Sequence, residues 1–494
     1  MYVAALNIVM LPVYVRYMGA EAYGLVGFFT LLQTWFQLLD MGLTPTLSRE
    51  FSRFRAGVVD IATVSGLVRA MEWFFSGVGL ISALVVIFAA NWIGQNWLKP
   101  QELTHSELVH CIMLMGGMLA PRWLVGLYRS GLSGMERMVV INLTGMLVAT
   151  LRAVGAWLVL TTWTTRPTGF FVYQFAVAVL ELGLMRIVLY RRFPMHGIGV
   201  WPDLRALRGI LRMAGSMAFL TGLWAAFSQM DKLLLSKLLD LRTYGFFVVA
   251  TTLAGGISLL AAPIGQALQP RLAVLVAQNN EAGLTALYRA STQAIAAILF
   301  AVAGVMTCFA SPLLLAWTNN PEVSQNAANV VPLYAIGNAI AALLGLGFLI
   351  QFAFGYLRWH VIGNCIFGIV WLPGIYFAAC RAGAIGVGWV WLGANLAYLL
   401  FWMPIAHRKL LPSLWWRWPL QDVGPVALAV ALVAVVFGQL DLTACSRVTV
   451  IGTVCGATVV FALAGLLAGS QTRAFLVRLP QQLKLANAGL QSDK

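Results

Sequence analysis

Charged residues are scarce in this sequence. Asp, Glu, Lys and Arg make up 10% of the 494 residues, whereas 60% are hydrophobic and the mean hydropathy is +0.83. A soluble chain of this length normally has about a quarter of its residues charged. The net charge of +15 does not indicate a nucleic-acid partner, because the basic residues lie mostly between apolar segments and form no exposed runs.

Patterns that carry catalysis or bind metals are also missing. The six cysteines have neither CxxC nor any other metal-like spacing, so we expect neither a disulfide framework nor a metal site. The five histidines are scattered, and no glycine-rich phosphate loop is present, so the chain has no ATPase of its own. A charged n-region followed by a cleavage site, the pattern of a signal peptide, is absent. We therefore predict a protein that is not an enzyme, without catalytic residues, metal or bound cofactor.

Long apolar stretches recur along the whole chain. About 20 apolar residues, rising 1.5 Å each in a helix, cross a hydrocarbon core of about 30 Å. A transmembrane β-barrel would instead show alternating segments of about ten residues. We predict an all-α polytopic membrane protein of about fourteen transmembrane helices, with two six-helix bundles around a central cavity and two further C-terminal helices. The expected helices are 2–18, 22–47, 60–90, 107–131, 138–163, 169–191, 209–236, 243–269, 288–317, 327–356, 358–380, 384–407, 421–439 and 449–469.

The first twelve predicted helices show the pattern of an internal duplication of six helices. "RYMGAEAYGLVGFF" and "KLLDLRTYGFFVVA" each place a Tyr-Gly pair at the start of a helix, and both helices end at a proline near basic residues. Six helices per half gives both halves the same orientation, which is a parallel repeat. The predicted domains are an N-terminal bundle at 1–195, a cytoplasmic linker at 196–208, a C-terminal bundle at 209–418, and two helices with a cytoplasmic tail at 419–494.

Basic residues set the expected orientation. Segments that follow even-numbered helices hold 21 of the 32 Lys and Arg residues, and segments that follow odd-numbered helices hold 8. Since cytoplasmic loops carry the excess of Lys and Arg, both termini are predicted to be cytoplasmic.

A polar stripe interrupts the second apolar segment. In "TLLQTWFQLLDMGLTP", residues Thr30, Gln33, Gln37, Asp40 and Thr44 follow spacings of three and four, which places them on one helix face. A charged side chain at the middle of a membrane helix costs about 2.5–3.5 kcal/mol on insertion scales. We therefore predict that this face lines a watery cavity or packs against protein, and does not face lipid.

The other buried charges lie mostly in the first six helices, namely Arg69, Glu72, Arg122, Arg152 and Glu181. The second six helices hold almost none. One interpretation pairs them internally, as Arg69 with Glu72, Arg152 with Glu181 and Arg122 with Asp40. The other is a hydrated cavity with a cationic wall. Arginines there suit phosphate or pyrophosphate, because the guanidinium fork matches phosphate oxygens, and carboxylates there suit a proton or cation.

Two stretches resemble bacterial polysaccharide flippases, the O-antigen flippases included. "LPVYVRYMGAEAYGLVGFF", with Pro12, Tyr14, Arg16, Gly19, Tyr23 and Gly24, is similar to the opening signature of that family. "MDKLLLSKLLDLRTYGFF", continuing to "PIGQALQPRL" at 272, resembles its seventh and eighth helices. The resemblance covers the first twelve helices and extends to the superfamily of multidrug, oligosaccharide-lipid and polysaccharide exporters. It departs at the short first helix.

The resemblance implies two bundles that face a central cavity, and export of undecaprenyl-pyrophosphate-linked oligosaccharide across the bacterial inner membrane by alternating access. The driving force would be a proton or sodium gradient. The candidates for binding pyrophosphate and sugar are Arg69, Arg122, Arg152, Gln33 and Gln37. The candidates for ion coupling are Asp40, Glu72 and Glu181. The partners would be the lipid-linked substrate, the bilayer, a polysaccharide polymerase and a chain-length regulator, with no nucleic acid.

Two alternatives stay open. A drug/cation antiporter of the same superfamily would prefer an acidic cavity, which the balance of charges does not favour. A membrane-embedded polysaccharide polymerase or ligase usually carries a large external loop, and the longest one expected here is 91–106.

Overall fold

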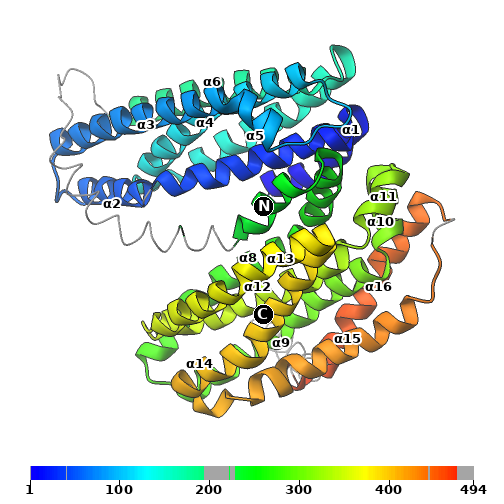
Figure 1. Ribbon diagram of the computed structural model, residues 1–494. Helices are drawn as coiled ribbons and strands as arrows, with labels where there is room; N and C mark the ends of the chain where they lie inside the picture. Colours follow the sequence, from blue (N-terminus) through cyan, green and yellow to red (C-terminus); the bar gives the residue numbers. More distant parts are fainter. Residues whose placement is uncertain (1, 41, 194–221, 223–227, 443–444, 475–494) are drawn as a thin grey trace, which may run out of the picture. The chain divides into compact units, whose positions relative to one another are not determined.

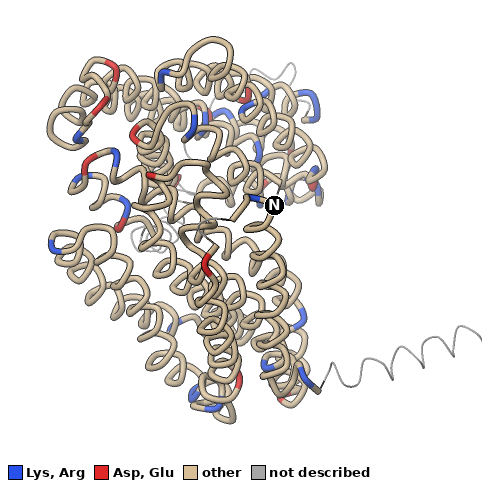
Figure 2. The backbone as a smooth tube through the Cα atoms, turned by 90° about the vertical axis from the view of Figure 1, so that its right-hand side faces the viewer, with Lys and Arg blue, Asp and Glu red and all other residues tan. Residues whose placement is uncertain are grey.

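The computed structural model describes residues 2–40, 42–193, 222, 228–442 and 445–474. Within these ranges every regular element is a helix, and 11 helices are long and apolar enough to cross a membrane. Charged residues are few along the backbone, and long stretches of helix have none (Figure 2). The predicted all-α polytopic membrane protein is confirmed.

The chain divides into two compact units, Met1–Val248 and Val249–Lys494. The first holds α1 (Tyr2–Gln37), α2 (Leu43–Arg55), α3 (Ile61–Asn96), α4 (His105–Gly134), α5 (Met138–Thr162), α6 (Pro167–Arg192) and the start of α8 (Leu241–Ala277) (Figure 1). The second continues from α8 with α9 (Glu281–Cys308), α10 (Ala310–Thr318), α11 (Pro321–Ala327), α12 (Val331–Ala353), α13 (Arg358–Ala397), α14 (Met403–Leu410), α15 (Gly424–Phe437) and α16 (Arg447–Ala468). The linker predicted at 196–208 lies outside the described residues.

Helix α1 is two helices that fold back on each other at Gly19. This residue has a φ of 85°, which residues with a Cβ rarely adopt. Tyr2 and Gln37, near opposite ends of α1, line the same pocket, whereas a straight helix of this length would hold them about 50 Å apart. The first two predicted helices therefore exist and meet at Gly19.

Helix α13 has the same construction. Gly383 has a φ of 54°, and rings on either side of it meet in antiparallel order, with Trp371 on Trp391 and Phe367 on Tyr398. When α1 and α13 are each counted as two, the 11 candidate spans become thirteen. The remaining predicted helix, 209–236, falls largely outside the described residues.

Helix α4 is the central element of the first unit and packs along both α3 and α6. Its buried side joins an apolar core, in which Trp123 stacks on Phe75 with ring centroids 4.3 Å apart. Because this side is held by packing, the opposite side of α4, which carries Arg122 and Arg129, is presented to the cavity described below.

The two Tyr-Gly pairs of the predicted repeat lie back to back in the first unit. A Cβ added at Gly245 would collide with the Ala20 carbonyl oxygen, and one added at Gly24 would crowd the Leu241 carbonyl. Next to this close approach, Glu21 is a buried carboxylate that accepts the backbone N–H groups of residues 101, 102 and 103 at 2.8, 2.7 and 3.3 Å. These hydrogen bonds hold the segment before α4 against α1.

In the second unit, a buried polar cluster forms hydrogen bonds that hold the last two spans against α9. Asp422 is fully buried and accepts from Arg289 Nε at 3.0 Å and from the side-chain amide of Gln293. The side-chain amide oxygen of Gln293 accepts the backbone N–H groups of Gln471 and Thr472, just past α16. Asp422 belongs to the thirteenth predicted helix, outside the second six, and Arg289 lies near the start of α9 with 23% of its side chain exposed.

Candidate functional site

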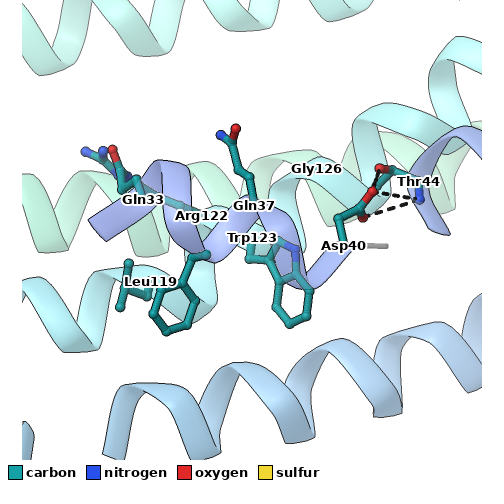
Figure 3. A pocket seen from close by; sticks show the side chains of 9 residues that line it. Gln33, Gln37, Asp40, Thr44, Leu119, Arg122, Trp123 and Gly126 are labelled. Carbon is teal, nitrogen blue, oxygen red and sulfur yellow. Dashed lines mark hydrogen bonds between the residues drawn. The ribbon is translucent and has the colours of Figure 1, made fainter. Parts of the chain in front are cut away.

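The first unit contains a cavity that is lined by residues of α1, α2, α4, α5 and α6. Two adjoining pockets, of about 360 and 750 Å³, share Gln33, Gln37, Arg122 and Gly126 and form one space, which we call the first-unit cavity. In Figure 3, Gln33 and Arg122 lie toward one end of the smaller pocket, and Asp40 with Thr44 lies at the other. Four of the five residues of the polar stripe, Gln33, Gln37, Asp40 and Thr44, therefore line this cavity.

The stripe is not on one continuous helix, contrary to the prediction of a helix over 22–47. Helix α1 ends at Gln37, a single 3-10 turn follows at Leu38–Asp40, and α2 begins after Gly42, which has a φ of 75°. Gln33, Gln37, Asp40 and Thr44 still line the cavity. Thr30 is not among the lining residues, and its hydroxyl donates to the Val26 carbonyl at 2.9 Å.

Asp40 holds the start of α2. Its carboxylate accepts the Thr44 hydroxyl at 2.6 Å and the Thr44 backbone N–H at 3.3 Å. A negative charge is favourable there, because unpaired N–H groups give a helix N-terminus a partial positive charge. The alternative pairing of Asp40 with Arg122 is therefore not formed among the described residues, although both side chains line the smaller pocket.

Glu181 is the centre of a charge cluster in the larger pocket. This buried carboxylate of α6 accepts from Arg152 of α5 at 2.6 Å and from Arg129 of α4 at 2.7 Å. The predicted pair of Arg152 with Glu181 is confirmed. The 21 Lys and Arg residues that follow even-numbered predicted helices include Arg129, because it is close to the end of the predicted helix 107–131. In the structure, Arg129 lies inside α4. Its spacing of seven from Arg122, two helical turns on the same face, is the signal that could have identified it.

Arg122 lies between the stripe and this cluster. Its guanidinium is 4.8 Å from the centroid of the Phe29 ring, and one terminal nitrogen is 3.5 Å from the Gln174 side-chain oxygen. Within the described part of the chain, the buried Nε–H groups of Arg122, Arg129 and Arg152 have no acceptor. An unsatisfied buried donor costs about 1–3 kcal/mol. These Nε–H groups are buried, so what the cavity offers to an oxyanion is the accessible part of the Arg129 and Arg152 side chains, which are 40% and 29% exposed.

Arg69 and Glu72 belong to a separate network. Glu72 accepts the hydroxyls of Tyr128 and Tyr190, both at 2.8 Å. Arg69 lies over the Tyr190 ring at 5.8 Å. Neither residue lines the first-unit cavity. The structure therefore brings together Gln33, Gln37, Asp40, Arg122, Arg152 and Glu181 from the predicted set, and it places Arg69 and Glu72 elsewhere.

Water access to the cavity can be measured by cysteine labelling. Single variants Gln33→Cys and Gln37→Cys, in a background without the six native cysteines, should react with a small membrane-permeant thiol reagent, because the reactive thiolate forms only in contact with water. Leu31→Cys is the matched control, since Leu31 lies on the same helix and is 1% exposed. Equal silence at all three positions would indicate a dry, packed interface.

Comparison with known families agrees with the fold. Residues 1–276, more than half of the chain, match the family described as polysaccharide biosynthesis protein. No curated protein matches the chain by sequence.

Two solved membrane proteins are similar in structure. The lipid II flippase MurJ, in an inward closed conformation, has a TM-score of 0.72 over 93% of this chain and 96% of that chain, at 12% identity. An inward-facing multidrug resistance transporter of the MATE family, from the MOP superfamily, has a TM-score of 0.62 over 82% of this chain and 95% of that chain, at 14% identity. At these identities the likeness establishes the fold.

Proposed function

The chain belongs to the polysaccharide biosynthesis protein family, and from this premise we propose that it is a flippase for undecaprenyl-pyrophosphate-linked oligosaccharide. The substrate would be a repeat unit such as that of O-antigen, moved across the bacterial inner membrane by alternating access. The resemblance expected from the sequence is confirmed at the level of family and fold.

The observation that carries the proposal is the arginine cluster of the first-unit cavity. Arg122, Arg129 and Arg152 face two carboxylates, Asp40 and Glu181, so positive charge is in excess. Each phosphate of a lipid-linked diphosphate carries a negative charge, and a guanidinium can bind its oxygens through two parallel hydrogen bonds. The partly exposed side chains of Arg129 and Arg152, which line the larger pocket, supply such donors.

The size of the cavity fits the head of such a substrate. A volume of about 750 Å³ lies within the range of about 300–1,000 Å³ that is usual for small-molecule sites. The amides of Gln33 and Gln37 and the side chain of Asn142 add hydrogen-bonding groups suited to sugar hydroxyls. The polyprenyl chain would remain in the lipid.

A drug/cation antiporter is the weaker alternative. A cationic substrate would meet three arginines in this cavity, and like charges at close range repel strongly where water is scarce. The MATE likeness, at 14% identity, supports the shared fold and carries no information on substrate.

Orientation and coupling complete the proposal. The excess of Lys and Arg in segments after even-numbered helices supports cytoplasmic termini. Asp40 and Glu181 line the cavity and are the better placed candidates for a coupling proton or cation. Glu72 is the weaker candidate, because it does not line the cavity and instead accepts the Tyr128 hydroxyl. A polysaccharide polymerase and a chain-length regulator are the partners we propose.

The proposal can be tested in vesicles that contain the purified full chain. A fluorescent undecaprenyl-diphosphate oligosaccharide should cross to the inner leaflet well above the rate in protein-free vesicles, as measured by loss of quenching by a membrane-impermeant reductant. The matching monophosphate lipid, which offers one anionic group fewer, should cross more slowly. Transport of a cationic dye, with no movement of the diphosphate lipid, would reverse the assignment.

A further inference from the structure

Glu181 holds two arginines from two different helices. One carboxylate oxygen accepts from Arg129 at 2.7 Å and the other accepts from Arg152 at 2.6 Å. The carboxylate is 6% exposed, whereas the arginine side chains are 40% and 29% exposed. Both arginine side chains therefore keep accessible surface beyond their contact with Glu181, and both line the larger pocket.

This arrangement leaves much of each guanidinium unused. An arginine has five N–H donors, and one carboxylate shared by two arginines leaves the Nε–H groups of both without an acceptor. The cluster adds little as a stabilising device, because apolar residues often replace a buried ion cluster at no cost. A ligand with more anionic oxygens than Glu181 would satisfy more of these donors.

We propose that Glu181 is an internal substitute for the substrate, which occupies Arg129 and Arg152 when the cavity is empty and is displaced by the incoming diphosphate. This inference rests on the proposed function. Glu181 competes with the ligand for the same donors and repels it once displaced. It is a positioning residue that weakens binding and favours release, which a transporter needs because a ligand held too tightly is not delivered.

The substitution Glu181→Gln tests the competition directly. Inorganic pyrophosphate should bind the purified full chain at least about tenfold more tightly in the variant than in the wild type, as measured by calorimetry. A hydrogen bond to a charged group is commonly stronger than the about 1.4 kcal/mol that a tenfold change represents. Glu50→Gln is the matched control, because Glu50 also pairs with an arginine, Arg53, but lies outside the cavity.

A second measurement separates competition from a structural role. In the vesicle assay, Glu181→Gln should lower both the substrate concentration for half-maximal rate and the maximal rate, because binding tightens while release slows. If Glu181 only oriented the arginines, its replacement would weaken binding and raise the substrate concentration for half-maximal rate. Equal or weaker pyrophosphate binding by the variant would overturn the inference and leave the diphosphate site intact. Absence of binding in both proteins would count against the proposed function itself.

The variant leaves two arginines without their carboxylate, so its folding has to be controlled. If Glu181→Gln does not fold, the double variant Glu181→Gln with Arg129→Gln removes one charge of each sign. Competition predicts that this protein binds pyrophosphate more tightly than the single variant Arg129→Gln, since Arg152 is then freed from Glu181. Equal or weaker binding than in Arg129→Gln would show that Glu181 does not compete.

Discussion

Replacing Arg122 by alanine should stop surface polysaccharide assembly while the protein remains in the membrane at near wild-type abundance. Among the described residues, Arg122 forms no ion pair; it lies over Phe29 and near Gln174. Removing it therefore leaves no carboxylate unpaired, so the effect on folding should be small. The effect on a bound diphosphate should be large, because each hydrogen bond to a charged group contributes about 1.5–3 kcal/mol, or roughly tenfold to more than a hundredfold in affinity.

Arg152→Ala should have the same effect on export, with a somewhat larger cost in stability, because Glu181 then keeps only Arg129. Lysine at either position retains the charge but loses the planar fork, so partial activity in Arg122→Lys would show that charge alone suffices. Arg53→Ala, in the exposed pair with Glu50, is the control. Normal surface polysaccharide in both alanine variants would contradict the pyrophosphate site, with abundance measured by immunoblot in the same cells.

The sequence predicted the site where spacing along one helix was the deciding factor. Gln33 and Gln37 are one turn apart and do face a common cavity, and Arg152 with Glu181 could be paired because both lie near the middle of their predicted helices. Arg129 was missed because it is close enough to the end of the predicted helix 107–131 to count as a loop residue. Side chains near helix ends are ambiguous by this reasoning, since predicted boundaries are uncertain by a few residues.

Partners from distant helices could not be predicted. Arg69 and Glu72 are three residues apart, and this spacing suggested an ion pair. In the structure, two tyrosine hydroxyls from α4 and α6 satisfy Glu72 instead. Tyrosines carry no charge signal in the sequence, and their position depends on how three helices pack. The early end of α1 had a local signal, since Gly42 lies within the stripe and Pro45 directly follows it, and both residues disfavour the middle of a helix.

The ion pair that joins α9 to the turn just before α15 could not be predicted from the sequence either. Asp422 lies four residues after Trp418 at the edge of a predicted helix, and Arg289 lies more than a hundred residues earlier. Only the fold brings the Arg289 Nε to 3.0 Å from the fully buried carboxylate. The same carboxylate holds Gln293, which in turn binds the backbone past α16.

Asp422→Ala should therefore destabilise the second unit more than any surface substitution. Removing one partner of a buried ion pair costs about 3–5 kcal/mol, because the other charge stays uncompensated. Arg289 retains some contact with solvent, with 23% of its side chain exposed, so we expect a loss near the lower end of that range. Abundance should fall several-fold, since a decrease of about 1–2 kcal/mol already has that effect in cells. Thermal unfolding of the purified protein gives the direct measurement.

The double variant Asp422→Leu with Arg289→Met separates the ion pair from simple loss of packing. Apolar residues of similar volume can replace a buried pair without cost, so the double variant should recover most of the lost stability, although Gln293 loses one acceptor. Glu281→Ala, an exposed residue at the start of α9, should change stability by no more than about 0.5 kcal/mol. Export should fall in Asp422→Ala only in proportion to abundance, unlike in Arg122→Ala. Unchanged thermal unfolding in Asp422→Ala would show that the cluster does not hold the last two spans.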